Sequence, residues 1–142
     1  LFVSRTNYCS LVWLTTTKTN IEKISLLQKK AIRHIANLEY LTHTRQAFQR
    51  YNVVKIQDMY EFRILLSYYY SSGFKSMVEG TALLKENTHS VNTRNTDKWL
   101  VPFFRTDYKL QTLEYILPTI LNKYNDIKKP AKTTLRRLFV MT

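Results

Sequence analysis

The stretch Thr19 to Leu38, TNIEKISLLQKKAIRHIANL, has the clearest helical periodicity in the chain. Its apolar residues recur at steps of three and four, at Ile21, Ile24, Leu27, Ala31, Ile35 and Leu38. This spacing puts them on one face of an amphipathic helix and predicts that they cover a core. Thr19 and Glu22 match a capping box, in which two side chains satisfy backbone donors at a helix start. We therefore predict a helix that begins near Asn20.

The polar side of the same helix is cationic. Lys23, Lys30 and Arg33 fall close together at helical spacing, and Lys29 precedes Arg33 by one turn. The whole chain has 22 Lys and Arg against 10 Asp and Glu, a formal charge of +12. Such an excess attracts polyanions over a Debye length of ~8 Å at physiological salt. Nucleic acid is the expected partner; no membrane is expected, since no apolar run approaches the roughly 20 residues of a spanning helix.

Two more helices are predicted in the first half of the chain. The low number of glycines and prolines, 2 and 3 in 142 residues, makes turns scarce and favours helix. A short helix is expected over Arg45 to Tyr51, and Asn52 ends it because Asn tolerates the left-handed conformation. A third helix is expected over Gln57 to Ser71, with Gly73 closing it.

The second half of the chain is less periodic. From Gly73 to Val101 the pattern predicts a loop or an extended segment. Helical spacing resumes from Leu110 to Leu121, where Pro118 predicts a kink or a break at Leu117. We predict a mainly α chain, a small helical bundle followed by a loop-rich segment and a C-terminal helical region. The expected segments are a helical subdomain over 1–72, a loop-rich connector over 73–109, and a C-terminal helix with a basic tail over 110–142.

No catalytic constellation is evident in the sequence. Two-metal nucleotidyl transfer needs clustered carboxylates, but the chain has no adjacent Asp pair and its three histidines lack partners at ligand spacing. Gly73 and Gly80 are the only glycines, so there is no Gly-rich phosphate loop. The single Cys9 lies in an apolar stretch, which predicts a core thiol rather than a nucleophile. We predict no catalytic residue, no metal site and no cofactor in this chain.

Basic and aromatic side chains therefore carry the functional prediction. Lys and Arg contact phosphates, and aromatic rings stack on bases. Arg94 and Arg105 flank an aromatic run that contains Trp99, Phe103 and Phe104. The competing interpretation of any cationic face is an ordinary solvated surface. The predicted nucleic-acid-binding residues are Lys23, Lys29, Lys30, Arg33, Arg94 and Arg105.

Four stretches, in order, carry a family resemblance. Residues 7–13, NYCSLVW, are similar to the pattern hxYCxxVW, and residues 27–33, LQKKAIR, to LQKRAIR. Residues 89–95, HSVNTRN, are close to HxYNTRN, with Val91 where an aromatic residue is usual. Residues 100–106 and 114–118 are similar to LPxxRT followed by xxGPxxWNxLP. Together they resemble the C-terminal region of reverse transcriptases from non-LTR retrotransposons of the LINE type, CR1- or jockey-like, as seen in arthropods. The last third departs from that pattern, since Leu117 stands where Gly is usual.

The resemblance implies a fragment of an RNA-directed DNA polymerase, and a chain that starts at Leu1 rather than Met is expected of a fragment. The fingers and the palm, with the metal-binding aspartates, precede this region in the family and are implied as its partners. The implied role, in the nucleus or the cytoplasm, is to hold template and primer, or target DNA, by sequence-independent phosphate contacts, with RNA and DNA both open. Two alternatives remain: a non-enzymatic basic helical adaptor that binds nucleic acid or a protein, and a decayed fragment that does not fold stably.

Overall fold

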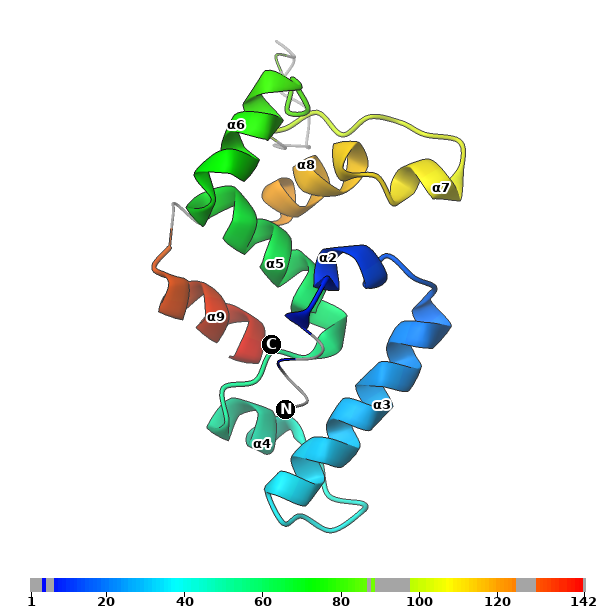
Figure 1. The fold of residues 1–142 in the computed structure, drawn as a ribbon, viewed down its shortest axis with the longest axis vertical. Coiled ribbons are helices and arrows are strands. Elements are labelled where there is room, and N and C mark those ends of the chain that lie inside the picture. Colours follow the sequence, from blue (N-terminus) through cyan, green and yellow to red (C-terminus); the bar gives the residue numbers. More distant parts are fainter. Residues whose placement is uncertain (1–3, 5–6, 87, 89–97, 125–129, 142) are drawn as a thin grey trace. The chain divides into compact units, whose positions relative to one another are not determined.

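The computed structural model describes Ser4, residues 7–86, Thr88, residues 98–124 and residues 130–141 (Figure 1). Within that part of the chain there are eight helices and no strand, which confirms the mainly α class. The chain divides into two compact units. Unit 1 comprises Leu1–Arg63 and Ala131–Thr142, and unit 2 comprises Ile64–Pro130. The division into the segments 1–72, 73–109 and 110–142 stays a prediction.

The described residues of unit 1 form five helical elements, including the first half of a helix that continues into unit 2. They are α2 (Ser10–Trp13), α3 (Lys18–Ile35), α4 (Arg45–Arg50), the beginning of α5 (Ile56–Tyr70), and α9 (Lys132–Met141) (Figure 1). The helix α4 contacts both α3 and α9. Ile32 of α3 packs with Ala47 and Phe48 of α4 in one buried cluster. Phe139 of α9 is buried and meets Phe62 of α5 edge to face, with ring centroids 5.6 Å apart.

A buried glutamine joins α3 to the start of α5. Gln28 is only 3% exposed. Its side-chain Nε2 donates a hydrogen bond to the Val54 carbonyl oxygen at 2.9 Å, and its Oε1 accepts one from the Ile56 backbone N–H at 3.0 Å. A buried amide is tolerated when its donors and acceptors are paired, and here it pairs two backbone groups at the start of α5. Gln28 therefore fixes which side of α3 faces the core.

The predicted orientation of α3 is wrong in part. Leu27 is 56% exposed and Ile35 63% exposed, whereas Ser25, Gln28 and Ile32 are the buried residues of the helix. The helix is thus rotated relative to the orientation that its apolar spacing predicts. The physical reason is the pair of hydrogen bonds of Gln28, which lets a polar residue occupy the centre of the buried face. The other apolar residues of the predicted stripe are half-buried, at Ile21, Ile24, Ala31 and Leu38.

The helix α3 starts two residues before the predicted start near Asn20, and the predicted capping box is wrong. The helix begins at Lys18, and its N-cap is Thr17, which has an extended backbone and no side-chain capping hydrogen bond. Thr19 and Glu22 therefore do not act as a capping box. Asn20 Nδ2 instead donates to Thr16 Oγ1 at 3.1 Å, which ties the first turn to the preceding residues. The Thr17 carbonyl accepts the N–H groups of the first turn, so the helix extends two residues further back than Asn20.

The end of α4 follows the prediction, because Asn52 has a φ of 51°, in the left-handed region. Gly73, in contrast, does not close the third helix. The helix α5 ends at Tyr70, and Ser71 is the N-cap of α6 (Ser72–Gly80), accepting a hydrogen bond on its side chain from the Phe74 N–H at 3.3 Å. A cap of this kind starts a new helix directly after the old one. The loop predicted from Gly73 is therefore wrong for residues 73–80.

Cys9 is exposed, so the predicted core thiol is wrong. It is the N-cap of α2 and has a left-handed φ of 47°. Its carbonyl oxygen accepts hydrogen bonds from the Val12 and Trp13 N–H groups at 2.9 and 3.3 Å. The next residue, Ser10, is buried, whereas Cys9 lies at the surface.

Unit 2 contains the second half of α5, then α6, α7 (Asp107–Leu110) and α8 (Leu113–Lys123). A break at Leu117 does not occur, because α8 continues through Pro118. Both residues are buried, and the packing of this apolar face holds the helix where proline removes one backbone donor. Asn122 accepts from the Trp99 N–H at 2.9 Å and donates to the Trp99 carbonyl at 2.7 Å. This pair of bonds fixes the segment before α7 on α8.

Candidate nucleic-acid interface

The positive charge is concentrated in unit 1. This unit contains 13 of the 22 Lys and Arg residues but 4 of the 10 Asp and Glu residues, so its formal charge is +9. Unit 2 contains the other 9 and 6, which gives +3. A compact unit with this imbalance produces a positive potential that attracts polyanions. Any phosphate contacts are therefore expected chiefly on unit 1.

Two of the predicted residues form an exposed cationic strip on α3. Lys23 and Lys30 are both exposed and lie seven residues apart, so they share one side of the helix, away from the buried Gln28. Leu26 and Leu27 are exposed on the same outer side. This surface is therefore cationic with apolar residues between the charges, and the sequence pattern predicted its charges but not its leucines.

Arg33 serves the loop that follows α3. Its Nε donates a hydrogen bond to the Thr42 carbonyl oxygen at 3.3 Å. Its guanidinium group lies over the Tyr40 ring, 5.9 Å from the ring centroid. Arg33 therefore holds the connection between α3 and α4, in addition to the phosphate-binding role that the sequence predicts.

Lys29 lines a cavity of about 340 Å³ in unit 1. The wall of the cavity also carries Arg45, Lys55 and His43, and none of the described residues that line it has a carboxylate. The guanidinium group of Arg45 is held by a hydrogen bond that its Nη2 donates to the Met141 carbonyl oxygen at 3.4 Å. The structure thus brings Lys29 together with two cations, Arg45 and Lys55, that the sequence prediction missed. These three residues are separated in the sequence, and only the fold brings them to the wall of one cavity.

The remaining predicted residues lie elsewhere. Arg94 lies outside the described residues, and Arg105 is an exposed residue of unit 2. Of the aromatic run beside Arg105, Phe103 is 90% exposed and could stack on a base. Phe104 packs near Tyr115, with ring centroids 6.4 Å apart. The predicted residues are therefore divided between the two units.

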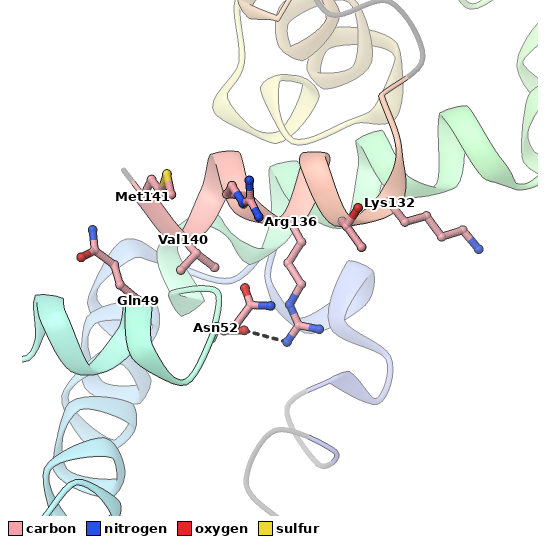
Figure 2. Close-up of a pocket in the computed structure, with 8 residues that line it drawn as sticks. Gln49, Asn52, Lys132, Arg136, Val140 and Met141 are labelled. Atoms are coloured by element: carbon pink, nitrogen blue, oxygen red, sulfur yellow. Dashed lines mark hydrogen bonds between the residues drawn. The ribbon is translucent and has the colours of Figure 1, made fainter.

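A second basic cavity, of about 700 Å³, lies between the end of α4 and α9 in unit 1 (Figure 2). Its cations are Lys132, Arg136 and Arg137. The sequence shows these residues as part of a basic tail, and the four-residue step from Lys132 to Arg136 indicates one helix face. Nothing in the sequence indicates that this face meets Asn52 at the end of α4.

No family model, curated protein or solved structure matches this chain. Its function is therefore inferred from its own residues.

The described residues offer little for covalent or metal chemistry. Within them, no group of three or more His, Cys, Asp or Glu side chains is arranged to hold a metal ion. Nor does any helix among them have the length and apolar character needed to cross a membrane. Burial raises the pKa of Tyr60, Tyr68 and Tyr69 above its ordinary value, and the charge of Glu79 adds to the effect at Tyr68. These three tyrosines are therefore neutral near pH 7. Among the described residues, the cationic surfaces remain the best candidate for a site.

Proposed function

We propose that this chain binds nucleic acid through sequence-independent phosphate contacts made mainly by unit 1. The observation that carries the proposal is the charge of +9 on this unit. Phosphate contacts by Lys and Arg supply most of the affinity of non-specific nucleic-acid binding, because each contact releases condensed counterions. They need no base-reading geometry, so scattered lysines on α3 and in the cavities suffice.

The cavity around Lys29 supports the proposal in a specific way. A negatively charged group that enters it meets Lys29, Arg45 and Lys55, and no carboxylate on the described wall opposes it. The exposed Lys23 and Lys30 extend the positive surface along α3. A phosphate chain of several nucleotides can contact such a surface at more than one point, and the contacts then act together.

We further propose that the chain is a C-terminal, post-palm piece of a non-LTR retrotransposon RNA-directed DNA polymerase. The support is the ordered set of family-like stretches in the sequence, which includes LQKKAIR on α3. In that role the chain would hold template and primer, or target DNA, while the fingers and palm of the same polyprotein carry out synthesis. A transcript that encodes an adjacent Asp pair upstream of Leu1 is expected, and an upstream reading frame without polymerase motifs would overturn this part.

A protein-interaction module is the second candidate, and one observation favours it. Leu26 and Leu27 are exposed on α3 next to Lys30. A partner helix with apolar and acidic residues would cover such a surface. Under this alternative, substitution of the leucines weakens partner binding, while nucleic-acid affinity is low and depends on no particular lysine.

The test is a salt titration of binding. The purified chain is titrated into fluorescein-labelled single strands and duplexes, and anisotropy is followed from about 50 to 200 mM salt. The proposal predicts that log K falls linearly with log salt, with a slope of about −0.7 per phosphate contact for a single strand and about −0.9 for a duplex. An absence of binding at the lowest salt, or an affinity that does not change with salt, would overturn it.

A further inference from the structure

The cavity between α4 and α9 has one-sided chemistry. Three cationic side chains, Lys132, Arg136 and Arg137, come from two successive turns of α9, and no described residue that lines the cavity is acidic. Its volume of about 700 Å³ falls in the roughly 300–1,000 Å³ range of small-ligand sites. A cavity of this size, whose described lining residues carry only positive charge, fits an anionic group with a further portion attached.

Arg136 is held in place at the wall of the cavity. Figure 2 shows its side chain extending from α9 toward Asn52, and its Nη2 donates to the Asn52 carbonyl oxygen at 2.8 Å. The left-handed φ of 51° at Asn52 is the local turn that presents this carbonyl. An arginine with one donor already bound loses less conformational entropy when a ligand arrives. Arg136 is thus pre-organised, and its guanidinium fork has further donors for an oxyanion.

The rest of the wall is suited to the neutral part of a nucleotide. Gln49 carries an amide that can both donate to and accept from a base edge or a sugar hydroxyl. Val140 is buried and Met141 is exposed, and both line the cavity with apolar atoms. A phosphate alone would leave the apolar surface of Val140 and Met141 unused, whereas a nucleotide unit would use the cations, the amide and the apolar surface together.

We propose that this cavity holds one nucleotide unit of a single nucleic-acid strand, its phosphate against Arg136 and Arg137 and its sugar or base against Gln49, Val140 and Met141. The inference rests on the proposed function and names the form of nucleic acid that this part of unit 1 takes. A duplex keeps its bases stacked inside and presents only its backbone to a cavity of this size. A single strand can turn a nucleotide into it, as strand-binding proteins require.

The test uses the full chain and labelled strands of about 12 nucleotides, single-stranded or annealed to a complement, at about 100 mM salt. Arg137→Glu is the main variant and Arg137→Gln the milder one. The matched control is Arg50→Glu, which makes the same charge change on α4 at a residue that does not line the cavity. Far-UV circular dichroism and the thermal midpoint verify that each variant is folded. Gln49→Ala tests the contact with the neutral part.

We expect Arg137→Glu to lower single-strand affinity by about tenfold or more, the scale of one charge-assisted hydrogen bond, and by clearly more than Arg50→Glu does. Arg137→Gln lowers it by a smaller factor, and Gln49→Ala lowers single-strand affinity while duplex affinity stays unchanged. Equal losses for Arg137→Glu and Arg50→Glu would overturn the inference while leaving the proposed function intact. Equal losses of duplex and single-strand affinity would overturn the single-strand assignment, as would displacement of the strand by poly-glutamate at matched charge concentration. A wild-type chain that binds no strand would overturn the proposed function itself.

Discussion

The sharpest prediction for the stability of unit 1 compares two single substitutions on α3, Gln28→Leu and Leu27→Gln. Gln28→Leu keeps the side-chain volume similar but removes the bonds to the Val54 carbonyl and the Ile56 N–H. A buried backbone group left unpaired costs about 1–3 kcal/mol, and the added apolar contact of leucine offsets part of the loss of two. We expect the free energy of unfolding to fall by about 2–4 kcal/mol. The thermal midpoint then falls by about 4 °C per kcal/mol for a chain of this size.

The matched control is at the preceding position on the same helix, Leu27. Leu27 is 56% exposed, so Leu27→Gln is expected to change stability by about 0.5 kcal/mol or less. Urea unfolding is measured in a Trp99→Phe background, in which the fluorescence of Trp13 reports unit 1, because the chain has two tryptophans and each unit contains one. The ranking Gln28→Leu well above Leu27→Gln supports the orientation of α3. The reverse ranking would refute it, and a wild-type chain without a cooperative transition would support the unstable-fragment alternative.

Three further outcomes are expected. Phe139→Ala removes a ring that is buried and packed edge to face on Phe62, and should cost about 3–5 kcal/mol in urea unfolding, whereas Leu138→Ala, at an exposed neighbour, should cost far less. Asn52→Ala puts a Cβ-bearing residue without a polar side chain at a left-handed φ and should cost about 1 kcal/mol, while Asn52→Gly should not; equal losses would contradict the role of the turn. Burial first and the Glu79 charge second raise the pKa of Tyr68 above 10.0, so absorbance titration should show Glu79→Gln lowering that pKa without restoring the ordinary value. The stability that Tyr68 contributes is fully present below pH 10.0 and is lost as the pH rises through the raised pKa; an unchanged titration would contradict the Glu79 effect.

Features of short sequence stretches predicted several helices and one helix end correctly. The three- and four-residue spacing identified α3 and α5, and the tolerance of Asn52 for the left-handed conformation predicted the end of α4. The start of α6 was missed because Gly73 resembled a helix stop, although Ser71 caps a new helix there. Element type was therefore more predictable than element boundaries.

The orientation of α3 could not be predicted, because its cause lies far along the chain. Gln28 bonds to Val54 and Ile56, which are 26 and 28 residues away, and no periodicity in the helix itself encodes these bonds. Because these hydrogen bonds place Gln28 on the buried face of α3, Leu27 and Ile35 lie at the surface.

The sequence predicted which cationic residues are candidates for the site, but not which of them the fold brings together in one cavity. The lysines of α3 were predicted from their spacing, and the structure adds Arg45 and Lys55 beside Lys29. The cavity between α4 and α9 depends on a contact between Arg136 and Asn52 across 84 residues. Net charge predicts an attraction to polyanions, whereas the fold decides which cations can act on one phosphate.

The salt dependence of strand binding tests most directly whether unit 1 provides the phosphate contacts. Two pairs of exposed lysines are neutralised by glutamine, Lys23 with Lys30 in unit 1 and Lys85 with Lys98 in unit 2. The unit 1 pair should flatten the slope of log K against log salt for a single strand by about 1.4, the value for two phosphate contacts, while the unit 2 pair leaves it nearly unchanged. Equal slopes for the two double variants, or a larger change for the unit 2 pair, would contradict the assignment of nucleic-acid binding to unit 1.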